Sequence, residues 1–169
     1  MEQQNATPPL AAARIAPFIS IAERVLLGAF VVGAILFVLG IDDVVATFSI
    51  AVLAVVFFLR AYVPAPLPGD ISEDTDGEAG FSQLLALSIV PKVLWISCAI
   101  SAVAITFHII EMPRENYRQM LMIGGLTLAI GSVMLTFFMA IGMKHIRLVA
   151  GVLFRAIPLC ALDIYLLVR

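Results

Sequence analysis

The chain has 169 residues, of which 62% are hydrophobic and 13% charged, and its mean hydropathy is +1.09. A soluble domain carries about 25% charged residues, so lipid must replace water around much of this surface. The net charge of −2 is too small to indicate a nucleic acid or another strongly charged partner. Cys98 and Cys160 both lie in apolar runs, which indicates neither a disulfide framework nor a cysteine-rich metal site.

The N-terminal half contains a first pair of apolar runs. Residues 1–16 are polar and then rich in proline and alanine, and we expect them to be a flexible segment. The segment 17–63 holds two runs of about the 20 residues that one crossing requires, separated by Asp42 and Asp43. The first run lacks a basic head and a small-residue cleavage site, so we expect it to insert uncleaved. We therefore predict a transmembrane hairpin over 17–63.

An acidic linker is predicted over 64–82. Three prolines and a glycine end the preceding helix, and five acids follow within 70–78. Part of this segment resembles a calcium-binding EF-hand loop, but Gln83 stands at the twelfth position, where a bidentate acid is required. We interpret the acids as a solvated linker and expect no metal site there.

The C-terminal half contains a second hairpin, over 83–143, and a last helix, over 146–168. The first run of this hairpin is longer than one crossing needs, and Pro91 and Lys92 are expected to mark where its surface part meets its buried part. The returning run, Met120–Met143, has no charged residue and is the strongest helix signal in the chain. The last helix either crosses the membrane or packs on the others as a kinked helix.

These runs predict an all-α polytopic bundle of four or five transmembrane helices, forming one domain over 17–169. A shift of 70 residues aligns the two hairpins, although such matches arise easily between apolar segments. The matched pairs are Ala29 with Ala99, Ala34 with Ala104, Ile35 with Ile105 and Phe37 with Phe107. The hypothesis is a duplicated hairpin plus one helix.

Basic residues set the expected orientation, because lysine and arginine accumulate on the cytoplasmic side. The N-terminal side of the predicted spans carries Arg14, Arg24, Arg60, Lys92, Lys144 and Arg147. The other side carries Arg114, Arg118 and Arg169. We expect a multi-pass protein of the cell membrane, in the bacterial inner membrane, with a cytoplasmic N-terminus.

The turn of the second hairpin carries a family resemblance. Phe107-His-Ile-Ile-Glu-Met-Pro113, followed by Met120-Leu-Met-Ile-Gly-Gly-Leu-Thr-Leu-Ala-Ile130, is similar to the membrane hairpin of the gliding-motility and type IX secretion motor stator. It also resembles uncharacterised small bacterial membrane proteins that duplicate this hairpin. The stator's proton-handling carboxylate has no counterpart in the returning run, so the resemblance does not extend to motor activity. This chain departs from the pattern at His108 (lysine there), Met112 (an aromatic residue) and Arg114 (glycine).

Small residues spaced four apart predict close contacts between helices, because lipid-embedded helices associate through close packing. Such a face serves either as an interface between subunits or for packing within the chain. The candidate helix-packing residues are Ala29, Gly33, Ser97, Ser101, Gly124, Gly125, Ala129 and Ser132.

His108 and His145 raise the question of haem ligation, but the returning helix separates them by a membrane thickness. We expect no cofactor. His108 lies three residues before Glu111, at a spacing that lets two side chains interact on a helix. We expect a hydrogen-bonded pair at the membrane surface, with proton relay as the alternative.

Arg155 and Asp163 are ionisable residues within the last apolar run, and such residues usually face protein or water. They share a helix face but lie about 12 Å apart along its axis, too far for a direct salt bridge. Pro158 between them frees a carbonyl and is expected to bend the helix. The two interpretations are a structural polar contact and a polar passage for transport or relay. For Asp163 the nearest candidate cations are Arg155, Lys92 and Arg169.

The sequence contains no motif of a known enzyme class, and we expect no catalytic activity. We predict a non-catalytic integral membrane subunit or scaffold of a larger assembly, whose partners are the lipid bilayer and other membrane-protein subunits or copies of itself. The alternative is a small transporter or channel that uses the charged last helix.

Overall fold

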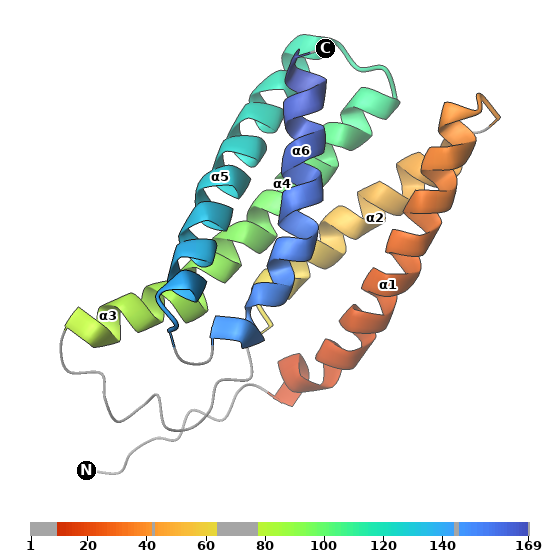
Figure 1. The fold of residues 1–169 in the computed structure, drawn as a ribbon. Coiled ribbons are helices and arrows are strands. Elements are labelled where there is room, and N and C mark those ends of the chain that lie inside the picture. The colour runs from red at the N-terminus through yellow and green to blue at the C-terminus, as the bar shows by residue number, and fades with distance from the viewer. Residues whose placement is uncertain (1–9, 42, 64–77, 144–145, 169) are drawn as a thin grey trace.

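The computed structural model describes residues 10–41, 43–63, 78–143 and 146–168, and every regular element in these ranges is a helix (Figure 1). The elements in chain order are α1 (Leu10–Val38), α2 (Val44–Ala61), α3 (Glu78–Leu84), η2 (Leu85–Ile89), α4 (Val90–Ile109), α5 (Arg114–Ala140), η3 (Ile146–Leu148), η4 (Ala150–Val152) and α6 (Leu153–Val168).

Five helical segments in these ranges are long and apolar enough to cross a membrane. They are Pro17–Val38, Val44–Ala61, Phe81–Ile109, Arg114–Ala140 and Ile146–Val168. The predicted all-α membrane bundle is thereby confirmed, and by length and composition the last helix counts as a fifth span. The chain is a polytopic helical membrane protein.

Helix α4 lies at the centre of the bundle. It packs against α2, α5 and α6, whereas α1 packs mainly against α2. The buried residues of α4 include many small ones, which let neighbouring helices approach closely in lipid. The core that surrounds it includes Leu94, Cys98, Leu121 and Leu128. Of the five spans, the one that includes α4 has the largest buried share and that of α1 the smallest.

The third span begins earlier than the sequence predicted. Helix α3 continues through the π-helical turn η2 into α4, and the N–H of Val90 bonds to the carbonyl of Leu85, five residues back. Ala86 and Leu87 are already buried within the bundle before Pro91. The expectation that Pro91 and Lys92 mark the membrane boundary stays a prediction. The wider turn fits the position of Pro91, which has no N–H to continue the regular ladder.

Helices α1, α4 and α5 end in the same backbone cap. In each cap an N–H bonds to a carbonyl five residues back: Ile41 to Leu36, Met112 to Phe107, and Met143 to Phe138. The residue before each of these donors has positive φ: Gly40 at 68°, Glu111 at 57° and Gly142 at 75°. This cap satisfies the last carbonyls of a helix, and its positive-φ position is normally glycine. Because Glu111 has a side chain, its positive φ costs about 1 kcal/mol or more.

The caps place the two hairpin turns 71 residues apart, one more than the shift that aligns the sequences. Helix α5 also has this cap, but α2, its counterpart in the first hairpin, ends with bonds that reach only three residues back, so the shared cap is not specific to duplication. A duplicated hairpin stays a hypothesis.

The bundle has two ends, which we name for use below. The N-terminal face is the end where α1, α4 and α6 begin and where α2 and α5 finish (Figure 1). The turn face is the opposite end, where the α1–α2 and α4–α5 turns and the end of α6 lie.

Candidate functional site

A buried carboxylate joins three helices near the N-terminal face. Glu23 on α1 is 1% exposed, and each of its oxygens contacts a different guanidinium. Oε2 lies 2.8 Å from Nη1 of Arg60, in the last turn of α2. Oε1 accepts a hydrogen bond of 2.6 Å from Nε of Arg155, in the first turn of α6. We call Glu23, Arg60 and Arg155 the charge clamp.

The clamp rests on an aromatic side chain of the central helix. The guanidinium carbon of Arg60 lies 5.1 Å from the ring centroid of Trp95, and that of Arg155 lies 5.9 Å away. Both distances are within the range of cation–π attraction. Trp95 in turn packs against Phe57 of α2, with ring centroids 5.7 Å apart. The clamp and its ring therefore bring α1, α2, α4 and α6 together.

The electrostatics of the clamp are those of a buried ion triad. A carboxylate removed from water costs several kcal/mol, and two guanidinium contacts offset that cost. Arg155 also donates from Nη1 to the carbonyl of Gly151, 2.7 Å away, which fixes its side chain. Arg60 lies where a cation is favoured by the carbonyl end of a helix. Helix α1 packs mainly on α2. The bond from Arg155 to Glu23 therefore links the first half of α1 directly to α6.

A second polar contact lies deeper, between α4, α5 and α6. Asp163 on α6 is fully buried and accepts a hydrogen bond of 2.5 Å on Oδ2 from the hydroxyl of Ser101 on α4. Glycines on α5 allow this approach. A Cβ on Gly124 would lie 2.5 Å from Ser101 Oγ, and one on Gly125 would lie 3.2 Å from Asp163 Cβ. Among the described residues, Oδ1 of Asp163 has no hydrogen-bond partner.

The structure separates the three residues of the last helix that the sequence grouped together. Arg155 belongs to the charge clamp, Asp163 belongs to the contact with Ser101, and Pro158 lies inside an α6 that continues to Val168. Two of the cations considered for Asp163 are accounted for elsewhere. Arg155 bonds to Glu23, and the side chain of Lys92 is exposed, whereas Asp163 is buried. Arg169 lies outside the described residues.

The predicted pairing of His108 with Glu111 is wrong, because His108 pairs with Tyr117 instead. Nδ1 of His108 lies 3.1 Å from the hydroxyl of Tyr117, and the two rings meet edge-on. Glu111 is exposed in the turn. The physical reason is that Glu111 follows the last helical residue, Ile109, with positive φ, so the helical spacing behind the prediction does not apply. Tyr117, one turn into α5, takes the place of Glu111.

Four of the eight predicted packing residues lie at two close contacts between helices. Gly33 lies against the backbone of Ala46, where a Cβ would come within 2.5 Å of its nitrogen, so α1 and α2 meet closely there. Gly124, Gly125 and Ser101 form the α4–α5–α6 contact described above. Ser97 is buried on α4, and partly buried positions are taken by Ala29, Ala129 and Ser132. Gly131, which the spacing did not select, receives the side chain of Leu94.

The charge clamp is the feature that sequence reasoning missed. The sequence identifies Arg155 as an ionisable residue within a span and Arg60 as one of the basic residues that set the orientation, and it gives no partner for either. The first span, Pro17–Val38, includes Glu23, and an acid within a span is by default a functional or pairing site. That rule identifies Glu23, but the sequence alone does not identify its partners.

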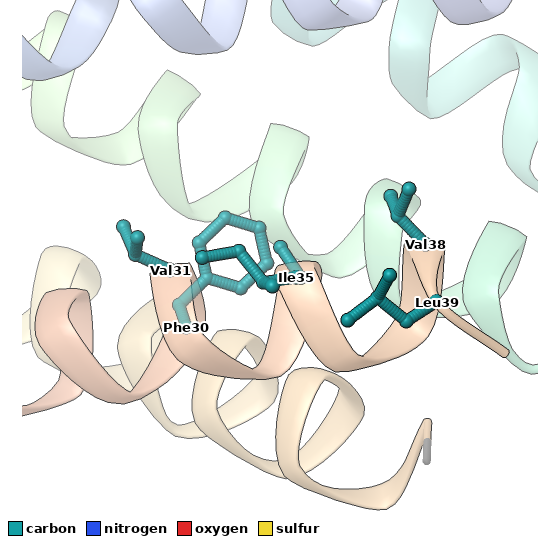
Figure 2. A pocket seen from close by; sticks show the side chains of 6 residues that line it. Phe30, Val31, Ile35, Val38 and Leu39 are labelled. Carbon is teal, nitrogen blue, oxygen red and sulfur yellow. The ribbon is translucent and has the colours of Figure 1, made fainter. Parts of the chain in front are cut away.

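An apolar groove of about 380 Å³ lies along α1 near the turn face. Figure 2 shows its lining side chains, which all come from the last part of α1 and the residue that follows it. The lining residues are Phe30, Val31, Ala34, Ile35, Val38 and Leu39. The surface of the groove is entirely apolar, which suits a hydrocarbon chain or an apolar helix and offers no polar group to a solute.

Within the described ranges, no three His, Cys, Asp or Glu side chains lie close enough to hold a metal ion. The EF-hand-like stretch of the acidic linker falls mostly outside these ranges. Comparison with protein-family models, curated proteins and solved structures found no match. The resemblance to the motor stator therefore stays a prediction.

Proposed function

We propose that this protein is a non-catalytic subunit of a larger membrane assembly, and that α1 is the helix that contacts its partner. The partner is a transmembrane helix of another subunit. The protein belongs in the bacterial inner membrane with its N-terminal face toward the cytoplasm, as the distribution of basic residues favours.

The observation that carries this proposal is the outward face of α1. Gly28 is exposed, and a Cβ placed on it would meet nothing within 4 Å. Val31, Ile35 and Val38 follow at spacings of three and four, and all three are exposed. On a regular helix Gly28 points roughly 140° away from Gly33, which faces α2. A glycine beside a ridge of branched residues is the pattern through which transmembrane helices approach each other.

The engagement of the intramembrane charges supports a subunit over a transporter. Arg155 is held by Glu23, and Asp163 by Ser101, so both serve contacts between helices of this chain. The described groove is apolar, whereas a passage for ions or polar solutes needs polar lining groups. These contacts favour a rigid helical scaffold.

Gly28→Leu is expected to remove the partner while leaving the chain itself stable. The added side chain meets no atom of this chain, so the free energy of unfolding should change by less than about 0.5 kcal/mol. A partner helix in close contact could not accommodate it. The measurement is purification of the tagged chain from its native membrane in mild detergent, with quantification of the co-purified subunit and thermal denaturation of the purified chain.

Two variants make this test specific. Val133→Leu, an exposed change on α5, should keep the partner at the level of the natural chain. Gly33→Leu should lower the thermal stability of the chain itself, because the new side chain would meet the backbone of Ala46. The proposal fails if Gly28→Leu retains the full amount of partner. It fails equally if the natural chain purifies alone and moves ions or solutes when reconstituted in liposomes.

A further inference from the structure

We propose that the charge clamp is a binding site for the phosphate group of an anionic phospholipid at the N-terminal face. This inference is independent of the partner helix at α1. It requires that the five helices cross a bilayer, so that headgroups surround the ends of α2, α4 and α6.

The charge clamp carries an excess of positive charge and of hydrogen-bond donors. Two guanidinium groups share the single carboxylate of Glu23, which leaves one positive charge in excess. Each arginine has five N–H donors, and these outnumber the two carboxylate oxygens and the Gly151 carbonyl that accept from the clamp. A phosphate oxygen is the acceptor that guanidinium groups bind in a fork-like geometry.

Both guanidinium groups of the clamp are accessible from outside the bundle. The side chains of Arg60 and Arg155 are 30% and 27% exposed, while that of Glu23 is 1% exposed. Arg60 is the next-to-last residue of α2, and Arg155 is the third residue of α6. Arg60 therefore lies at the end of the second span, whereas Arg155 lies inside the fifth span, Ile146–Val168, and Trp95 inside the third. Arginine side chains within a span extend toward the membrane surface, which brings the exposed edges of both guanidinium groups within reach of lipid phosphates.

Further basic residues lie close to the clamp in the sequence. Lys92 is exposed and lies one turn before Trp95 on α4, closer to the N-terminal face. Arg24 is exposed and follows Glu23 on α1. Basic pockets between transmembrane helices on one side of a membrane are typical sites for anionic headgroups. The position of the clamp within the spans favours a membrane lipid over a soluble phosphate as its source.

Trp95 is the single tryptophan of the chain and touches both arginines, so it reports directly on this site. The purified chain is reconstituted in phosphatidylcholine bilayers containing phosphatidylglycerol, with bromine on the acyl chains of one lipid or the other. Bromine quenches tryptophan fluorescence at short range, so the ratio of quenching gives the relative occupancy of the two lipids beside Trp95. The expected result is a several-fold preference for phosphatidylglycerol.

Variants of the clamp have opposite expected effects. Arg60→Gln should lower the preference roughly fivefold, which corresponds to the loss of one cation near the membrane surface. Glu23→Gln should raise it, because both guanidinium groups lose their internal counterion. Lys92→Gln, an exposed change that leaves the clamp intact, should also lower the preference. Arg118→Gln, exposed at the turn face, is the matched control and should leave it unchanged.

Equal quenching by the two brominated lipids in the natural chain would overturn the proposal. So would a preference that persists unchanged in both Arg60→Gln and Lys92→Gln. Inorganic phosphate at millimolar concentration should not relieve the quenching by brominated phosphatidylglycerol. Relief by inorganic phosphate would assign the site to a soluble anion and contradict a lipid headgroup.

Discussion

Glu23→Ala is expected to lower the free energy of unfolding by about 3 kcal/mol, because the two guanidinium groups lose the carboxylate that lies between them. The loss also releases α1 from α6, so α1 should become the first helix to separate. The measurement is thermal denaturation in detergent, together with protease sensitivity of the α1–α2 turn. Glu115→Ala, an exposed acid at the start of α5, is the matched control and should change the stability by less than about 0.5 kcal/mol.

A triple replacement separates charge pairing from packing in the clamp. Buried ion groups can often be exchanged for apolar residues of similar size with little loss. Methionine at positions 23, 60 and 155 together should therefore restore most of the stability that Glu23→Ala removes. Equal denaturation temperatures for Glu23→Ala and Glu115→Ala would show that the clamp does not hold α1 to the bundle.

Gly125→Leu is expected to lower the free energy of unfolding by about 3 kcal/mol, at the upper end of the cost of overpacking a core. Even a Cβ at this position lies 3.2 Å from Asp163 Cβ, so a leucine must push α6 away from α5. That movement would also break the hydrogen bond from Ser101 to Asp163. Thermal denaturation of the purified chain measures the effect.

Leu126→Ala provides the comparison for Gly125→Leu on the same helix. Leu126 is 63% exposed and faces away from the α4–α5–α6 contact, so its truncation should cost less than about 0.5 kcal/mol. Similar denaturation temperatures for the two variants would contradict close packing at Gly125.

The bundle could be predicted from the sequence because bilayer thickness sets a length that apolar runs must match. Each run between Pro17 and Val168 reaches that length, and turns rich in glycine or charge separate the runs. The sequence does not predict the π-helical turn before Pro91, through which α3 continues into α4. Hydropathy records the length of such a helix and not the geometry of its turns.

The clamp could not be predicted, because its members are far apart in the chain. Glu23 and Arg155 are separated by 132 positions, and Ser101 and Asp163 by 62. Periodicity indicates which residues share a helix face, but it does not indicate which helices become neighbours. The small residues were easier to identify, since close helix contact in lipid depends on side-chain size alone. Gly33 and Gly124 accordingly lie where a Cβ would collide with a neighbouring helix.

Cysteine labelling in intact cells tests most directly whether five helices cross the membrane with the N-terminal face inside. In a background without Cys98 and Cys160, single cysteines replace Gln3, Asp76, Asn116 and Arg169. A membrane-impermeant maleimide should modify positions 116 and 169 in intact cells, and positions 3 and 76 only after permeabilisation. Modification of positions 3 and 169 from the same side would contradict five crossings, and modification of position 76 but not 116 in intact cells would reverse the proposed orientation.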